Sequence, residues 1–159
     1  MVIEIPLRQI NQFTYALVVK GDLATDDLLI QYFDIFTDQR LSKKDISLMM
    51  AEKQRTLFIA NTGYTGFLQG NWKVVSKVPI DLMKKFDHSA ITFVMYEDGK
   101  YLINQVDSLA AESDLIEVDE KRGKTFSNPI GLFGHLSIED ILYQYFKGTS
   151  MEELIKYEL

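Results

Sequence analysis

The chain has 159 residues, of which 47% are apolar and 25% are charged, and it contains no cysteine. A chain of this length buries roughly 70% of its unfolded surface, so we expect one domain over residues 1–159. The lack of cysteine excludes disulfides, cysteine-ligated metals and thiol catalysis. No apolar run approaches the roughly 18 residues of a membrane span, and the N-terminus lacks a signal-peptide pattern, which favours a cytoplasmic protein with no membrane partner.

Charge is distributed unevenly along the chain. Lys and Arg number 17 and Asp and Glu 23, a net charge of −6. Residues 1–96 hold 11 basic and 10 acidic side chains, whereas residues 97–159 hold 6 and 13, so the two parts carry +1 and −7. Binding to nucleic acid through phosphate contacts needs a basic surface, and no nucleic-acid partner is therefore expected.

The acidity is concentrated in a segment with weak strand or helix periodicity, residues 107–120. Such a run usually forms a solvated loop, and the sharper interpretation is an acidic face for a basic partner. The candidate partner-binding residues are the carboxylates of this segment and of an earlier turn: Asp107, Glu112, Asp114, Glu117, Asp119, Glu120, Asp26 and Asp27.

The first third of the chain has the composition of β-strands. Residues 2–7, 13–19 and 28–36 are rich in Val, Ile, Tyr and Phe, and a polar turn joins the second run to the third. We expect these two runs to pair as a hairpin. The third run is apolar at both sets of alternating positions, which predicts a central strand covered on both faces.

A short helix and further strands are expected next. Ser42 can cap the helix and Asp45 can return the capping hydrogen bond. Three apolar runs follow at residues 56–60, 64–68 and 72–78, and the turn sequences between them predict an antiparallel meander.

The clearest local signal is an Asp-Gly turn at residues 98–99. Both central positions of a two-residue hairpin turn need positive φ, which Asp and Gly tolerate. The turn sets the register, in which Glu97 faces Lys100 and tyrosine faces tyrosine at the next position.

The C-terminal part has helical periodicity. An apolar stripe begins at Ile138, with Ser137 as the expected N-cap and Gly148 as the exit residue. Ser150 and Glu153 repeat the capping pattern before a second stripe. The predicted fold class is α+β: a mainly antiparallel twisted sheet or partial barrel, with a short helix after the second or third strand and two short C-terminal helices.

Motifs for catalysis are missing from the sequence, which has no phosphate-binding glycine loop, nucleophile elbow or zinc-protease motif. Adjacent acidic pairs lack EF-hand spacing, so no catalytic residue, cofactor or metal ligand is assigned. One hypothesis is that His88 acts as a general base oriented by Asp87. The simpler hypothesis is that His88 and His135 are surface or capping residues. Trp72 is expected in the core with a hydrogen-bonded indole N–H, and the alternative is an exposed binding residue.

Three segments carry a family resemblance. Residues 13–40 give a strand, a polar turn and a second strand containing Phe33-Asp34; residues 57–80 contain N-W-K-V-V-S-K-V-P-I; residues 130–148 lead from an apolar strand into a short amphipathic helix closed by Gly148. Together they resemble the immunity protein 26 family of bacterial polymorphic-toxin systems. Ser76 stands where that family usually has glycine, and Phe133 with Gly134 where a Trp-Asp pair is expected.

The resemblance implies a non-enzymatic, cytoplasmic protein that binds and inhibits a cognate toxin domain, often a nuclease. A nuclease site is basic, so an inhibitor with an acidic face gains from electrostatic steering of the encounter. The alternatives are a small-molecule-binding or hydrolytic domain that uses a cleft near His88, and a homodimer formed through the terminal helices.

Overall fold

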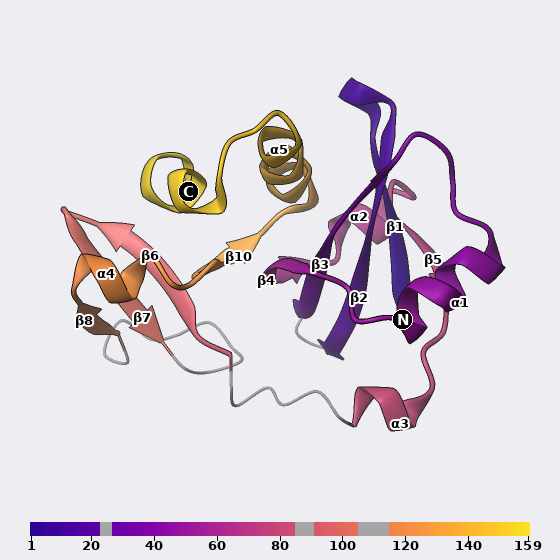
Figure 1. Ribbon diagram of the computed structural model, residues 1–159, viewed down its shortest axis with the longest axis horizontal. Helices are drawn as coiled ribbons and strands as arrows, with labels where there is room; N and C mark the ends of the chain where they lie inside the picture. Colours follow the sequence, from indigo (N-terminus) through magenta and orange to yellow (C-terminus); the bar gives the residue numbers. More distant parts are fainter. Residues whose placement is uncertain (23–26, 85–90, 105–114) are drawn as a thin grey trace.

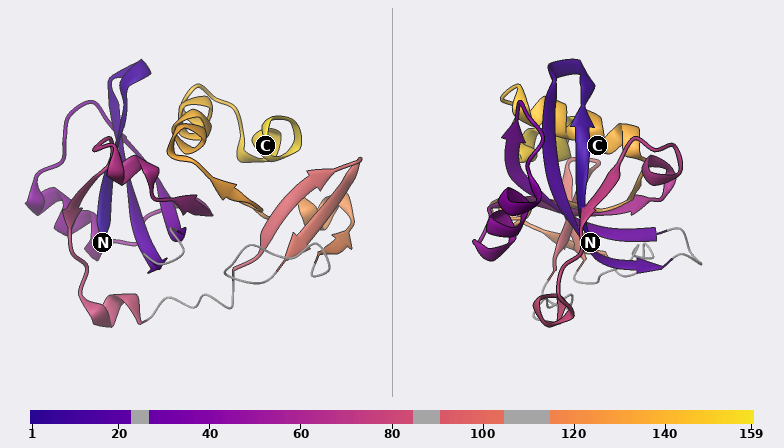
Figure 2. Two further views of the ribbon diagram at one scale, coloured as in Figure 1. Left: turned by 180° about the vertical axis from the view of Figure 1, so that it is seen from behind. Right: turned by 90° about the vertical axis from the view of Figure 1, so that its right-hand side faces the viewer.

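Two β-sheets and a set of short helices make up the residues that the computed structural model describes, which are 1–22, 27–84, 91–104 and 115–159. The sheets lie at opposite ends of the long axis, and the C-terminal helices lie between them on one side (Figures 1 and 2). The fold is α+β, with twisted, mainly antiparallel sheets that are not closed. This confirms the predicted fold class.

The larger sheet has the strand order β10-β4-β3-β2-β1-β5, and every neighbouring pair is antiparallel except β10 with β4. Its strands are β1 Val2–Leu7, β2 Gln12–Asp22, β3 Asp27–Thr37, β4 Thr56–Gly63, β5 Lys73–Ser76 and β10 Leu132–Phe133. β2 and β3 form the predicted hairpin. β3 is also central as predicted, because it buries Ile30 and Tyr32 on one face and Phe33 on the other.

Helices cover both faces of the larger sheet. On one face α1 buries Ile46 and Met49 against β2 and β3, and on the other α5 buries Ile138 and Leu142 against β1 and β4. The described helices and helical turns are η1 Arg8–Ile10, α1 Lys43–Ala51, α2 Thr65–Leu68, α3 Ile80–Met83, α4 Glu120–Gly123, α5 His135–Phe146, α6 Met151–Glu153 and η4 Leu154–Glu158. Within these ranges no helix has the length and apolarity needed to cross a membrane.

The predicted helix signals are largely confirmed. Ser42 and Asp45 form a capping box at the start of α1, and Ser150 and Glu153 form another at the start of α6. In each box the serine hydroxyl accepts a backbone N–H and the acidic side chain accepts the N–H of the serine. Gly148 follows α5 with φ of 106°, a conformation that glycine adopts without strain.

The smaller sheet has the strand order β8-β7-β6-β9, with β6 Phe93–Glu97, β7 Lys100–Asn104, β8 Ile116–Val118 and β9 Asn128–Pro129. Its β6–β7 hairpin has the predicted register, with Glu97 opposite Lys100 and tyrosine opposite tyrosine. Asp98 and Gly99 have φ of 51° and 79°, as the two-residue turn requires. Ile155 of the C-terminal turn packs on one face of this hairpin, so the end of the chain completes the smaller core.

The predicted meander over residues 56–78 is wrong in its middle and in its pairing. Residues 65–68 form α2, and β5 pairs with β1 rather than returning beside β4. The reason lies at Gly66: a Cβ there would stand 2.8 Å from the Trp72 ring and 2.9 Å from His135. This close backbone approach is made by a helical turn that stacks Tyr64 on Phe67, and an extended strand would separate those rings.

The start of α5 also differs from the prediction. Gly134 is the N-cap, and the amide of Ile138 already donates to the Gly134 carbonyl at 3.1 Å, so Ser137 lies inside the helix. The earlier start lets His135 pack edge-on against Trp72, where it is buried. Tertiary packing thus sets the helix boundary in place of the local serine signal.

Candidate functional site

Several predicted residues lie outside the described part of the chain. These are the partner-binding candidates Asp26, Asp107, Glu112 and Asp114, together with His88 of the alternative cleft. Asp27 is described and begins β3 in the larger sheet, opposite Gly63 of β4. Glu117, Asp119 and Glu120 belong to the other end of the molecule, so the structure does not bring them together with Asp27.

Glu117 and Asp119 are exposed, and each is held by a partner within the chain. Glu117 lies in β8, where its Oε2 accepts a hydrogen bond from Lys100 Nζ at 2.9 Å. This bond raises the pKa of the Lys100 amine. Asp119 is the N-cap of α4, and its Oδ1 accepts the backbone N–H of Arg122 at 2.8 Å.

Glu120 forms part of a three-residue ionic group. Its Oε1 lies 2.7 Å from Lys124 Nζ, and the same amine lies 3.3 Å from Oε1 of Glu152 in α6. Hydrogen bonding to Lys124 lowers the pKa of Glu120, and the two carboxylates raise the pKa of Lys124. The two contacts of Lys124 therefore link the end of α4 to α6.

The carboxylates of this region stand beside an unpaired strand edge. β8 lies at one end of the smaller sheet, and no strand in the described ranges pairs with its outer side. Ile116 of β8 is 59% exposed although its opposite residue, Ile103, is buried. An exposed apolar side chain on an unpaired edge strand is a feature of surfaces that bind another chain.

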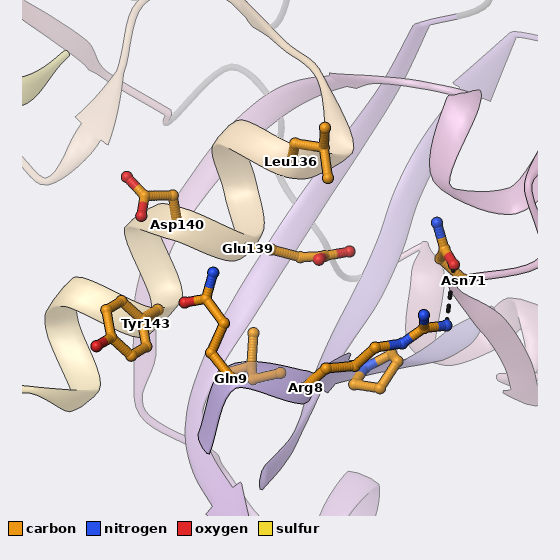
Figure 3. Close-up of a pocket in the computed structure, with 9 residues that line it drawn as sticks. Arg8, Gln9, Asn71, Leu136, Glu139, Asp140 and Tyr143 are labelled. Atoms are coloured by element: carbon orange, nitrogen blue, oxygen red, sulfur yellow. Dashed lines mark hydrogen bonds between the residues drawn. The ribbon is translucent and has the colours of Figure 1, made fainter. Parts of the chain in front are cut away.

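A second candidate feature is a cavity of about 330 Å³ between the first two to three turns of α5 and the segment around η1 (Figure 3). Leu136, Glu139, Asp140 and Tyr143 of α5 reach it because positions i, i+3, i+4 and i+7 share one helix face. The complete lining is Pro6, Leu7, Arg8, Gln9, Asn71, Leu136, Glu139, Asp140 and Tyr143.

Trp72 fixes one carboxylate of this cavity. The side chain is only 2% exposed, and its Nε1–H donates to Oε1 of Glu139 at 2.8 Å. The predicted core position with a bonded indole is therefore confirmed. Because Trp72 is packed in the core, the Glu139 carboxylate is held at the cavity wall.

Asn71 holds the Arg8 guanidinium, the positively charged group of the cavity, by a hydrogen bond. Its Oδ1 accepts a hydrogen bond from Arg8 Nη2 at 3.1 Å, and its Nδ2 lies 3.5 Å from Nε2 of the buried His135 and 3.3 Å from Oε1 of Gln69. In the view of Figure 3 the Arg8 guanidinium lies below the Glu139 carboxylate. No ion pair within 4.0 Å joins these two described groups.

No local sequence pattern indicates that the cavity residues come together. The one available signal was Trp72, whose N–H needs an acceptor when the ring is buried. That acceptor comes 67 residues later in the chain, on a helix face that sequence spacing alone assigns to solvent. Arg8 and Asn71 are likewise 63 residues apart and lie in turns without a distinctive pattern.

Neither candidate feature suggests a resident metal. Among the residues that the structure describes, no group of three or more His, Asp or Glu side chains is arranged to hold a metal ion.

Comparison with known proteins gives no assignment. No protein-family model, no curated protein and no solved structure matches the chain.

Proposed function

We propose that this chain is a non-enzymatic, cytoplasmic immunity protein that binds a basic protein toxin and blocks it, partly through its acidic C-terminal third. The observation that carries the proposal is the net charge of −7 on residues 97–159, part of which stands on exposed carboxylates beside the open edge of β8. The family resemblance of the sequence supports the same function.

The electrostatic part of the proposal concerns the rate of encounter. Near β8 the described residues 97–104 and 115–124 carry five acidic and four basic side chains, so this area is almost balanced by itself. The field that a basic partner meets at a distance is set by the charge of the whole C-terminal third. Such steering raises the association rate and weakens as salt shortens the Debye length.

The docking part of the proposal concerns β8 itself. Glu117 and Asp119 are oriented by Lys100 and by the α4 backbone, so little side-chain freedom is lost when a partner binds them. Ile116, which precedes Glu117 in β8, supplies exposed apolar area on the same edge strand. A small apolar centre with a charged rim is the usual composition of a transient protein interface.

The test uses the full chain and the toxin domain encoded by the neighbouring gene. Association and dissociation rates are measured by surface plasmon resonance at 50 and 300 mM NaCl, and light scattering reports the oligomeric state of each sample. We expect the association rate to fall about tenfold or more at the higher salt concentration. Binding without any salt dependence contradicts the electrostatic part of the proposal.

A charge-matched pair of variants locates the contact surface. Glu117→Lys with Glu120→Lys changes the net charge by +4 beside β8, and Glu52→Lys with Asp81→Lys makes the same change at the C-cap of α1 and on α3, at the other end of the molecule. We expect the first variant to weaken binding about tenfold or more and the second about threefold at most. Equal effects of both variants would place the contact away from β8.

A further inference from the structure

The cavity between α5 and η1 contains opposite charges that do not neutralise each other. Arg8 points toward Asn71, to which it donates a hydrogen bond, and Glu139 is held by Trp72. Each group is therefore fixed by an uncharged partner, although the two line the same space of about 330 Å³. A ligand that bears both a cation and an anion can pair with both at once.

The balance of charge in the cavity narrows the class of ligand. Arg8 contributes one positive charge, and Glu139 and Asp140 contribute two negative charges. The complement is a molecule with one carboxylate, two cationic groups and a net charge of +1. Free arginine and lysine have this composition, and a space of this size falls at the small end of ligand pockets.

We propose that this cavity is a binding site for a free basic amino acid, with Arg8 pairing with the α-carboxylate and Glu139 and Asp140 pairing with the two cationic groups. Arg8 suits the carboxylate because a guanidinium binds it in a bidentate geometry. Tyr143 and Gln9 stand beside Asp140 in Figure 3, where a ring face and an amide oxygen complement the side-chain cation.

This inference does not depend on the proposed function. The cavity is lined by α5 and η1, whereas the docking surface is built from β8 and α4. A failure to bind a basic amino acid would therefore leave the proposed toxin binding intact, and a failure to bind a toxin would leave the proposed amino-acid site intact.

The single tryptophan supplies the measurement. Trp72 donates to Glu139, so a cation that binds this carboxylate changes the surroundings of the only indole in the chain. Titration of the full chain with L-arginine should give a saturable change in Trp72 emission with a Kd of about 0.1–1 mM. Isothermal titration calorimetry gives an independent value.

Ligand analogues test each charge separately. Agmatine lacks the carboxylate and L-citrulline lacks the side-chain cation, and we expect each to bind about tenfold or more weakly than L-arginine. Agmatine binding as tight as L-arginine binding would overturn the role of Arg8. The absence of saturable binding of both L-arginine and L-lysine would overturn the proposal.

Protein variants complete the test. Arg8→Gln should weaken L-arginine binding about tenfold and leave agmatine binding unchanged, whereas Asp140→Asn should weaken both. Both side chains are exposed in the free protein, and circular dichroism shows whether each variant is folded. Asp81→Asn, on α3, is the control that removes one exposed carboxylate without touching the cavity. If Asp81→Asn weakens L-arginine binding as much as Asp140→Asn does, the loss comes from the overall charge of the protein. This result would contradict a binding site in the cavity.

Discussion

Asn128 binds the backbone of Ile59 across the junction of the two sheets. Its Oδ1 accepts the Ile59 N–H of β4 at 2.7 Å, and its Nδ2 donates to the carbonyl of Thr92 at 3.1 Å. One side chain thus bridges the larger sheet and the chain that enters the smaller one. Leu29, Phe93 and other apolar residues pack around this bridge.

Asn128→Leu should destabilise the fold, because it leaves the Ile59 N–H and the Thr92 carbonyl without their partner. We expect a loss of about 1–3 kcal/mol in the free energy of unfolding, measured by urea denaturation. Asn128→Asp keeps the acceptor and loses the donor, so its loss should be smaller. Equal stability of Asn128→Leu and the parent chain would show that the bridge contributes nothing.

Gly123→Ala should be among the more damaging small substitutions in the chain. A Cβ at this position of α4 would stand 2.3 Å from Cγ of Tyr101, whose ring is buried. Either the ring or α4 must move, at a cost of about 1–3 kcal/mol in unfolding free energy. Gly63→Ala is the matched control, since its nearest neighbours stand at 3.9 Å, and thermal denaturation of the two variants compares them directly.

Arg40→Ala should destabilise the chain through Glu4. The Glu4 side chain is 5% exposed, and its carboxylate pairs with Arg40 Nε at 3.2 Å and accepts from the Tyr15 hydroxyl at 3.3 Å. Removal of Arg40 leaves a buried carboxylate short of its cation, and because Arg40 is itself half-exposed we expect a loss of about 1–3 kcal/mol. The double variant Arg40→Ala with Glu4→Gln should recover part of this stability, and failure to recover it would assign the loss to the contact of Arg40 with Phe13.

Titration to alkaline pH should show that the Tyr32 hydroxyl is buried. Its hydroxyl bonds Thr62 Oγ1 at 2.8 Å in the core, and burial raises its pKa far above the ordinary value of 10.0. A group whose pKa is raised by folding contributes stability that is complete below the unfolded value and is lost as the pH rises above it. Absorbance at 295 nm should therefore show a step of tyrosine ionisation that coincides with unfolding, and Tyr32→Phe should reduce the amplitude of that step by one tyrosine. Ionisation of every tyrosine below the unfolding transition would contradict this prediction.

Local signals predicted the elements whose conformation depends on a few neighbouring residues. The Asp98-Gly99 turn and the Ser42 and Ser150 capping boxes are of this kind. α2 and the early start of α5 were missed because both are set by packing on Trp72, which brings together Gly66 and His135 from distant parts of the chain. β9 and β10 are only two residues long, too short for an alternating pattern, and each is defined by its pairing with a parallel partner.

The candidate sites also combine features set by the local sequence with features set by tertiary packing. Carboxylates near β8 could be named from composition alone, but their partners, such as Lys100 for Glu117, depend on the register of β7 with β8. The cavity was not predictable, because Arg8, Asn71 and Glu139 are each unremarkable in sequence and become a group only in the folded chain.

The short segment of residues 128–133 acts as a strap between the sheets. Its first two residues pair with β6 and its last two with β4, and α5 begins two positions later, at His135. The same short segment therefore connects the smaller sheet to the first turn of α5. Strand pairing at both ends of this segment resists a displacement of the smaller sheet relative to the larger one. Such a displacement would also move the start of α5, the helix that carries Glu139.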